Sequence, residues 1–282
     1  MRITITGASG LIGSKLAAAL TRRGDEVTKL SLRSGPPDPA ALAGRDAIVH
    51  LAGEPVAQRW TDQARRAIHE SREHGTRRLV EAIAKVDAKP RALISSSAVG
   101  YYGPHGDEPL DEDTPPGSDF LAQVCVAWER EANKAEGLRV VTVRTGVVLD
   151  TRGGALAKML TPFKLGGGGP VAGGRQYMSW IDLDDVVGIY LAAIDNPWEG
   201  PVNATAPEPV TNRTFSRALG RALHRPAIAP IPAAAIRLLY GDMAEIVTEG
   251  QRVIPRRTLE LGYAFQRTDL DEALRNALNR KA

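Results

Sequence analysis

Short apolar runs alternate with longer stretches of helical periodicity through the first 150 residues of the chain. The runs are rich in β-branched residues and are bounded by glycine, proline or polar residues, which is typical of buried strands. The stretches between them repeat apolar residues every three or four positions, which indicates helices that cover a sheet. We expect strands at 2–6, 26–32, 47–51, 92–95 and 140–143, and helices at 11–23 and 61–83. This alternation predicts an α/β fold with a doubly wound parallel sheet.

The regular alternation of strand and helix patterns ends near residue 150. A glycine run at 166–169 and several prolines interrupt the pattern, and the helical stretches become shorter, at 215–223, 233–240 and 270–278. We therefore expect residues 1–150 to form one domain and residues 151–282 a smaller domain that is partly interleaved with it.

Three glycines, Gly7, Gly10 and Gly13, separate the first expected strand from the first helix. Glycine permits a tight turn and lets backbone N–H groups approach a pyrophosphate at the start of a helix. A glycine-rich turn without a ligand is the alternative, but the place between strand and helix favours a dinucleotide site. Residues 1–150 are then a Rossmann-type dinucleotide-binding domain, and the C-terminal domain lies on the substrate side. The cofactor contacts expected in this turn are Gly7, Ser9, Gly10, Leu11, Ile12 and Gly13.

Ligands of such sheets bind where the carboxyl ends of the strands meet. The loops after the first four expected strands begin at Gly7, Arg33, Ala52 and Ser95. We expect these four loops to converge on one crevice.

The end of the second strand indicates which dinucleotide binds. An acidic residue about 20 positions after the glycine motif would bind a ribose 2′-hydroxyl, but Arg33 and Ser34 stand there instead. A guanidinium favours a 2′-phosphate through its charge and its paired hydrogen bonds. The sequence therefore predicts NADP rather than NAD, with a surface arginine as the alternative interpretation of Arg33.

Several motifs together resemble the extended short-chain dehydrogenase/reductase superfamily over nearly the whole chain. They are the G-x-x-G-x-x-G spacing, LAG at 51–53, SSSAVGYYG at 95–103 and SWIDLDDVV at 179–187. Trp128-Glu129, GGGGP, GPVNATAPEPVTN and GQRVIPRR are similar to an epimerase-like subfamily, often labelled sugar-nucleotide epimerases. The resemblance implies an oxidoreductase or epimerase that acts on a small polar, sugar-like substrate, and it favours a homodimer.

The resemblance also implies catalytic residues, with one departure. Ser97 matches the active-site serine of the superfamily, whose members carry a Tyr-x-x-x-Lys pair about 25 residues later. The matching region, residues 118–125, holds neither a tyrosine nor a lysine. Tyr101 and Tyr102 are the nearest phenols, and either would replace the missing acid if it faced the crevice; otherwise they are packing aromatics.

The third strand end and the following helix supply further candidates. By the resemblance Leu51, Ala52 and Gly53 contact the cofactor, as does Ser95 at the next strand end. Arg72 stands where extended family members carry an asparagine, and it can reach a cofactor phosphate or lie exposed on its helix. Glu54 either faces the same crevice or is solvated.

Composition excludes several other classes of protein. The net charge of +3 comes from scattered basic pairs, and with 5% aromatic residues it argues against a nucleic-acid partner. No apolar run approaches the roughly 20 residues that span a bilayer. The single cysteine, Cys125, forms no internal disulfide, and with no charged leader before the first strand this favours the cytoplasm. His69 and His74 are five positions apart, not four, so we expect no metal site.

Two functions remain open on the sequence alone. One is an NADP(H)-dependent oxidoreductase or epimerase. The other is a non-catalytic dinucleotide-binding protein that has lost the Tyr/Lys pair and acts through a protein partner. Turnover of a substrate distinguishes the first from the second.

Overall fold

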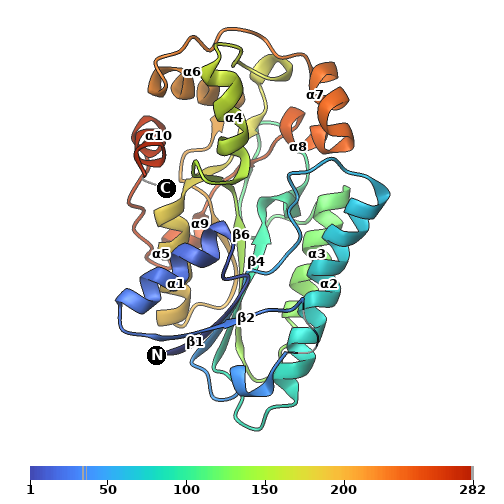
Figure 1. Cartoon of the computed structure of the whole chain (residues 1–282), viewed down its shortest axis with the longest axis vertical. Coiled ribbons are helices and arrows are strands. Elements are labelled where there is room, and N and C mark those ends of the chain that lie inside the picture. The colour runs from blue at the N-terminus through green and yellow to red at the C-terminus, as the bar shows by residue number, and fades with distance from the viewer. Residues whose placement is uncertain (34, 36, 281–282) are drawn as a thin grey trace.

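A six-stranded parallel sheet forms the centre of the structure, a computed structural model that describes residues 1–33, 35 and 37–280 (Figure 1). Its order is β10-β6-β4-β3-β1-β2. The chain passes from β1 to β2 at one edge and then crosses to β3 on the other side of β1, so the order reverses between β1 and β3. The strands are β1 (Arg2–Thr6), β2 (Glu26–Leu30), β3 (Ala47–His50), β4 (Ala92–Ala98), β6 (Arg139–Thr145) and β10 (Gly200–Ala204). The prediction of a Rossmann-type, doubly wound parallel sheet is confirmed.

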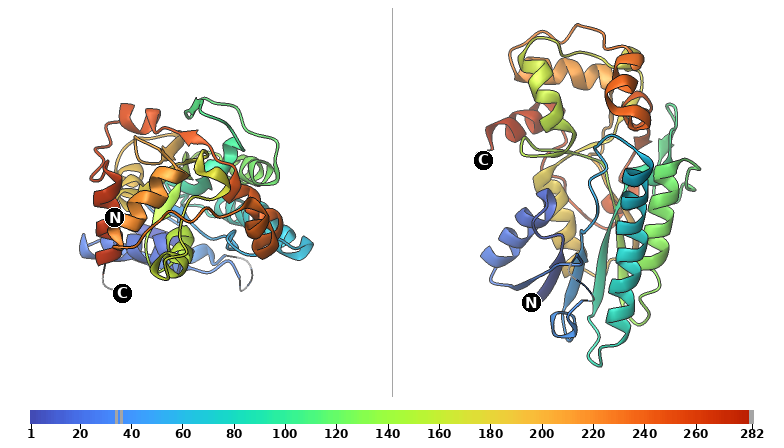
Figure 2. Two further views of the ribbon diagram at one scale, coloured as in Figure 1. Left: turned by 90° about the horizontal axis from the view of Figure 1, so that it is seen from above. Right: turned by 45° about the vertical axis from the view of Figure 1, so that its right-hand side comes forward.

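Helices cover both faces of this sheet. Helices α1 (Leu11–Arg22) and α5 (Leu183–Asp195) lie on one face, and α2 (Asp62–Ala84) and α3 (Phe120–Ala132) lie side by side on the other (Figures 1 and 2). Thr61 caps α2 by accepting a hydrogen bond from the backbone N–H of Ala64, and Asp119 caps α3 in the same way. These caps satisfy N–H groups that the first turn of a helix leaves free.

Most of the remaining elements form a smaller assembly beyond the carboxyl ends of the strands, at the top of Figure 1. Its strands pair in twos: β7 (Val147–Leu149) with β9 (Trp180–Asp182), β8 (Tyr177–Met178) with β11 (Val210–Thr211), and β5 (Pro109–Leu110) with β12 (Arg252–Val253). Its helices are α4 (Gly154–Lys164), α6 (Asn212–Ala222), α7 (Ala233–Tyr240), α8 (Ala244–Thr248) and α10 (Leu270–Asn279), whereas α9 (Arg256–Glu260) packs against β10 of the central sheet. Short 3-10 turns are η1 (Pro39–Ala41), η2 (Val99–Tyr102), η3 (Ala172–Gly174) and η4 (Gly241–Met243).

The chain after residue 150 contributes to both parts of the molecule. Strand β10 pairs with β6 in the central sheet, and α5 packs against that sheet with fully buried Ile189 and Tyr190. Helices α4, α6 and α10 instead enclose a separate apolar core around Trp180 and Phe215. The sheet therefore owes one edge strand and one covering helix to the C-terminal half.

Four of the five predicted strands differ in length from the prediction. Strand β3 ends one residue early at His50, and β6 runs over Arg139–Thr145 rather than 140–143. Strand β4 continues past residue 95 to Ala98, because its pairing with β6 extends to the Ala98–Thr145 pair. Strand β2 stops at Leu30, two residues early, where its pairing with β1 ends. Long-range pairing, which local pattern does not reveal, decides both ends.

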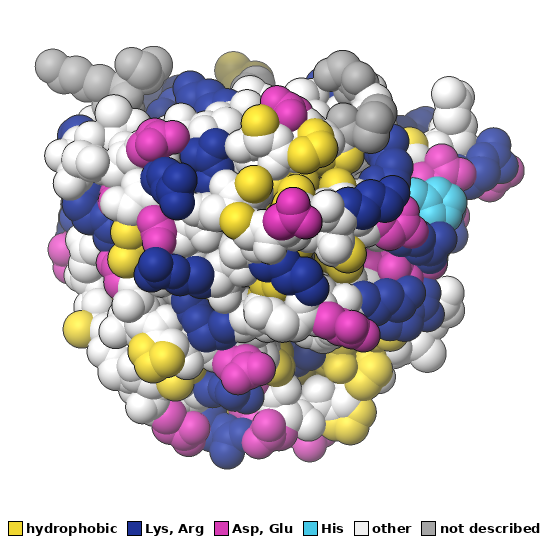
Figure 3. Space-filling model, turned by 90° about the horizontal axis from the view of Figure 1, so that it is seen from below, with side chains coloured by type: hydrophobic (Ala, Val, Ile, Leu, Met, Phe, Trp, Pro, Cys, Tyr) yellow, Lys and Arg dark blue, Asp and Glu magenta, His cyan; other side chains and the backbone are white. Residues whose placement is uncertain are grey.

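Basic and acidic side chains are interspersed on the face seen in Figure 3, at the amino ends of the strands. Ion pairs such as Arg45–Glu26 and Arg23–Asp25 lie in this region. In the part of the chain that the structure describes, no helix is long and apolar enough to cross a bilayer. Nor do three or more histidine, cysteine or acidic side chains gather there as metal ligands.

Candidate dinucleotide site

A cavity of about 390 Å³ lies at the carboxyl end of β1, between the start of α1 and the segment that follows β6. It is bounded by segments far apart in the sequence, so only the folded sheet creates it. Its lining residues are Gly7, Gly10, Leu11, Ile12, Gly13, Leu51, Ser96, Gly146, Val147, Val148, Gly154 and Ala155. A larger hollow of about 540 Å³ beside α6 is lined only by residues 217–228 and meets no strand end.

The glycine turn approaches other backbone too closely for larger residues at two of its three positions. Gly7 has φ +71°, and a Cβ there would lie 2.6 Å from the carbonyl carbon of Leu51. A Cβ at Gly13 would lie 2.3 Å from the carbonyl oxygen of Gly7. Gly10 is the N-cap of α1 and offers no side-chain cap, unlike the residues that precede α2 and α3. The first N–H groups of α1 therefore stay available to an anion such as a pyrophosphate.

Two other candidates, Ser9 on the turn and Arg33 after β2, do not line the cavity. Ser9 is exposed on the turn. Arg33 is exposed beyond the end of β2, and its backbone N–H donates to Ser31 Oγ at 3.3 Å. Ser34, the neighbour expected to assist it, lies outside the described residues.

The loop after β3 contacts Arg72 of α2. Leu51 lines the cavity, whereas Ala52 and Gly53 follow it without reaching the lining. Arg72 lies against this loop, because a Cβ on Gly53 would be 3.2 Å from its guanidinium carbon. Its Nη1 donates to the backbone oxygen of Glu54 at 3.0 Å.

Within the described part of the chain, no carboxylate forms an ion pair with Arg72, which donates to backbone oxygens of Glu54 and Ile68. Its guanidinium lies 5.0 Å from the ring centroid of Trp128, within range of a cation–π interaction. Burial lowers its pKa from the usual value for arginine. A desolvated cation against the loop after β3 is suited to an anionic ligand. The Glu54 side chain instead accepts a hydrogen bond from Gln58.

The serines of β4 alternate between the two faces of the sheet, as strand geometry requires. Ser96 lines the cavity, whereas Ser95 and Ser97 are buried and do not. Ser97 is 2% exposed, and its hydroxyl donates to Glu129 Oε1 on α3 at 2.7 Å. The motif does not identify Ser96 as a candidate. The alternation of side chains along the strand is the sequence signal that separates Ser96 from Ser95 and Ser97.

Tyr102 is not a candidate acid, which corrects the expectation from the sequence. It is fully buried, its hydroxyl donates to Asn203 Oδ1 at 2.7 Å, and it accepts from Arg144 at 3.0 Å. Burial raises the pKa of Tyr102 far above its usual value. Tyr101 is half-buried, and the Arg144 guanidinium stacks 3.4 Å from its ring centroid.

Apolar packing fills the region that matches the missing Tyr/Lys pair. Leu121 and Cys125 lie on α3 and face Gly100, where a Cβ would meet Leu121 Cβ at 3.3 Å and Cys125 Sγ at 3.9 Å. Burial and the nearby Glu129 carboxylate raise the pKa of the Cys125 thiol to about 12. The thiol is therefore neutral near pH 7 and replaces neither missing group.

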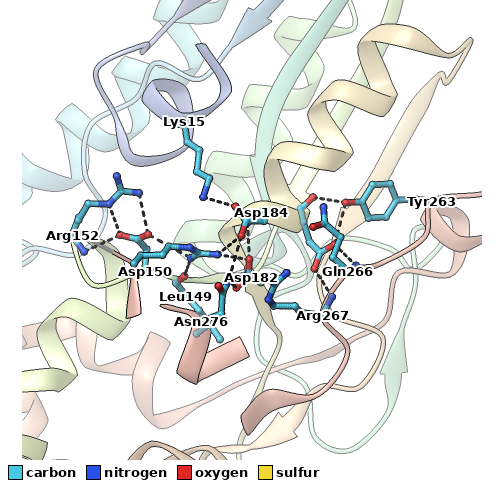
Figure 4. Close-up of polar contacts among 12 residues, drawn as sticks. Lys15, Leu149, Asp150, Arg152, Asp182, Asp184, Tyr263, Gln266, Arg267 and Asn276 are labelled. Atoms are coloured by element: carbon cyan, nitrogen blue, oxygen red, sulfur yellow. Dashed lines mark hydrogen bonds and ion pairs between the residues drawn. The ribbon is translucent and has the colours of Figure 1, made fainter. Parts of the chain in front are cut away.

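A network of ion pairs supports one wall of the cavity (Figure 4). Arg280, just past α10, donates to Asp182 at 2.5 Å, to Asp184 at 2.9 Å and to the backbone oxygen of Leu149 at 2.9 Å. The same segment carries Asp150, which binds Arg152 through two hydrogen bonds of 2.9 and 3.1 Å. This segment leads directly to Gly154 and Ala155 in the cavity wall. Lys15, two residues past the last glycine of the turn, pairs with Asp184.

Replacement of Arg280 by alanine is expected to lower the free energy of unfolding by about 3 kcal/mol at pH 7, because buried Asp182 loses its cationic partner. Burial raises the pKa of Asp184, but hydrogen bonds from Lys15 and Arg280 outweigh it and hold that pKa well below its usual value. A depressed carboxyl pKa stabilises the fold above the unfolded pKa of about 3.9 and loses this effect as the pH falls below it.

Urea denaturation of both proteins between pH 7 and pH 3 measures this effect. The stability difference between wild type and Arg280→Ala should shrink as the pH falls below about 4. A difference that is the same at both ends of the range would contradict the assignment. Arg275→Ala, an exposed neighbour on α10, is the matched control and should change stability by less than about 0.5 kcal/mol.

Comparison with known proteins agrees with this architecture. Residues 3–205 match the model of the NAD dependent epimerase/dehydratase family, and residues 231–277 match a domain of unknown function, DUF1731. The human epimerase family protein SDR39U1 is 39% identical over 289 residues, covering 98% of this chain and 99% of that protein. The Mycobacterium bovis epimerase family protein Mb2239 is 42% identical over 296 residues, covering 99% and 98%.

Two solved structures extend the comparison. The crystal structure of human SDR39U1 with NADPH has a TM-score of 0.89 at 36% identity, and the match covers 99% of this chain and all of that one. A nucleoside-diphosphate sugar epimerase from Corynebacterium glutamicum has a TM-score of 0.80 at 36% identity, covering 99% of this chain and 58% of that one. The chain therefore belongs to the NAD-dependent epimerase/dehydratase family.

Proposed function

We propose that this protein is an NADP(H)-dependent oxidoreductase or epimerase whose substrate is small, polar and sugar-like. The observation that carries the proposal is the cavity between the glycine turn and Gly154, which the uncapped start of α1 faces. The human relative crystallised with NADPH and the relative described as a nucleoside-diphosphate sugar epimerase support the cofactor and the substrate class.

The residues present fit a dinucleotide. The N–H groups at the start of α1 would hold the pyrophosphate, and Gly7 and Gly13 keep the turn close enough for this contact. Arg33 would bind the 2′-phosphate, since a guanidinium suits a dianionic phosphate better than a ribose hydroxyl. Leu51 and Arg72 would border the cofactor on the side of β3. Bound NADP(H) supplies hydride transfer, which no protein side chain provides.

The substrate contacts that we propose come from the end of β4 and the turn after it. Ser97, the serine expected here from the sequence, is buried, donates its hydroxyl to Glu129 and does not line the cavity, so we assign it no contact with the substrate. Tyr101 is the phenol near this strand end that burial leaves partly accessible. It is our candidate for proton transfer, with Ser96 as a polar contact inside the cavity.

A non-catalytic role is the second candidate. Leu121 and Cys125 pack against Gly100 in the region that carries the Tyr/Lys pair in the superfamily, which favours a protein that binds the cofactor without turnover. Such a protein would act through a protein partner.

A substrate screen that follows the absorbance of reduced nicotinamide distinguishes the two. We expect turnover with a sugar nucleotide, ketone or aldehyde, and a kcat lower by about 100-fold in Tyr101→Phe, which is typical for loss of a general acid. Ser96→Ala should raise KM, because it removes the hydroxyl that lines the cavity. Tyr263→Phe, which removes a hydroxyl bound to Asp185, is the control and should keep its activity. Full activity in both Tyr101→Phe and Ser96→Ala would contradict the residue roles, and tight binding without turnover would favour the second candidate.

A further inference from the structure

We propose that Arg78 on α2 is a second specificity residue, which binds the adenosine 2′-phosphate together with Arg33. This inference rests on the proposed function and deepens it. The sequence alone presents Arg77 and Arg78 as one more basic pair on a helix face, and the structure separates their roles.

Arg78 lies beside the end of β2. Its Nη2 lies 3.4 Å from the backbone oxygen of Leu32, a residue 46 positions earlier in the chain. Arg33 follows Leu32 directly. The guanidinium of Arg78 therefore lies at the carboxyl end of β2, where doubly wound folds bind the adenosine ribose.

Core packing holds Arg78 in this place. Leu79, the next residue on α2, is fully buried in the same apolar cluster as Leu32 and Leu42. Because Leu79 and Leu32 share this cluster, α2 cannot slide along the end of β2 without opening the core. Arg78 itself stays exposed and so accessible to a ligand.

The positive charges of Arg33 and Arg78 are available to a ligand. Within residues 1–33, 35 and 37–280, neither Arg33 nor Arg78 forms an ion pair. Arg77 contrasts with them, because it pairs with Glu73 at 2.9 Å and with Glu131 at 3.2 Å. Two guanidinium groups without a carboxylate at one strand end attract a dianion. A phosphate monoester is such a group, because its second pKa is about 6 and it therefore carries about 1.5 to 2 negative charges near pH 7.

The place of Arg78 at the end of β2 indicates which phosphate of the cofactor it would bind. The pyrophosphate is expected at the start of α1, which follows β1. The end of β2 is the neighbouring strand end, and the group expected there is the ribose with its 2′-substituent. NAD carries a hydroxyl at that position and would gain little from either arginine. Arg78 should therefore affect selectivity between the two cofactors more than affinity for both.

Calorimetric titration of the full chain with NADP⁺ and with NAD⁺ tests the proposal. In Arg78→Ala we expect the Kd for NADP⁺ to rise about tenfold, the effect of one lost charge-assisted hydrogen bond, and the Kd for NAD⁺ to stay within about twofold. Arg33→Ala should act in the same direction, and the double variant should lose the preference for NADP⁺. Arg78→Lys should retain part of it.

Arg91→Ala is the matched control, because Arg91 precedes the amino end of β4, at the opposite end of the strands from the proposed site, and is 83% exposed. It removes the same charge and should leave both affinities unchanged. An unchanged Kd for NADP⁺ in Arg78→Ala, or equal losses for both cofactors, would overturn the role of Arg78. If the wild type binds neither dinucleotide, the proposed function fails instead.

Discussion

Replacement of Gly10 by glutamate is expected to raise the Kd for the dinucleotide by at least ~100-fold, about 2.8 kcal/mol, while the protein stays folded. Gly10 is exposed at the start of α1, with an extended backbone (φ −74°, ψ 173°) that any residue adopts. A Cβ there would meet only the carbonyl oxygen of Gly7, at 3.3 Å. The added carboxylate would occupy the space of the pyrophosphate and repel its charge.

Gly106→Glu is the matched control for this variant. Gly106 is exposed, a Cβ there has no neighbour within 4 Å, and the position lies outside the cavity lining. It adds the same charge and should leave cofactor affinity unchanged. Circular dichroism establishes that both variants are folded, and calorimetry measures their affinities. Wild-type affinity in folded Gly10→Glu would place the phosphate site elsewhere.

Replacement of Glu129 by alanine is expected to cost about 3 to 5 kcal/mol of unfolding free energy, the largest stability effect we anticipate. Arg144 and Glu129 form a buried pair with two parallel hydrogen bonds of 2.9 Å. Glu129 also accepts the hydroxyl of Ser97. Its removal leaves a buried guanidinium without a counter-charge and a buried serine without an acceptor.

Urea denaturation midpoints measure this loss. Asp271→Ala breaks the exposed Arg221–Asp271 pair and serves as the comparison, with an expected change of no more than about 1 kcal/mol. A loss below about 1 kcal/mol in Glu129→Ala would show that water reaches the Arg144 pair and that the pair does not hold β6 against α3.

The sheet and the glycine turn could be predicted from the sequence because their signals are local. Apolar runs and helical periodicity are contiguous features, and Gly7, Gly10 and Gly13 stand between one strand and one helix. The convergence of strand ends then follows from parallel topology alone. The structure brings the glycine turn together with Leu51 after β3 and Ser96 on β4, as this rule requires, whereas the described part of the loop after β2, which the sequence predicts in the same crevice, does not line the cavity.

Other parts of the site depend on contacts between distant segments. Gly154 and Ala155 enter the cavity wall because β7 pairs with β9 and because Arg280 donates to the backbone oxygen of Leu149 at the end of β7. The buried hydroxyl of Tyr102 donates to Asn203, which is 101 residues away and belongs to the edge strand β10. Neither contact has a local sequence signal.

The serines of β4 show a third limit. The motif fixes which residues occupy 95–97, but the face that each one presents depends on the register of β4 with β6. A change of one residue in that register would exchange Ser96 and Ser97 between the cavity and α3. The motif therefore indicates this strand end, while the pairing of the folded sheet determines which hydroxyl lines the cavity.

Calorimetric titration of the wild-type chain with NADP⁺ and NAD⁺ tests the central claim most directly. The cavity at the glycine turn and Arg33 at the end of β2 lead us to expect saturable binding of one dinucleotide per chain. We expect NADP⁺ to bind at least about tenfold more tightly than NAD⁺, as charge-assisted hydrogen bonds to the 2′-phosphate imply. No heat of binding with either dinucleotide would contradict the cofactor site, and equal affinities would contradict its selectivity.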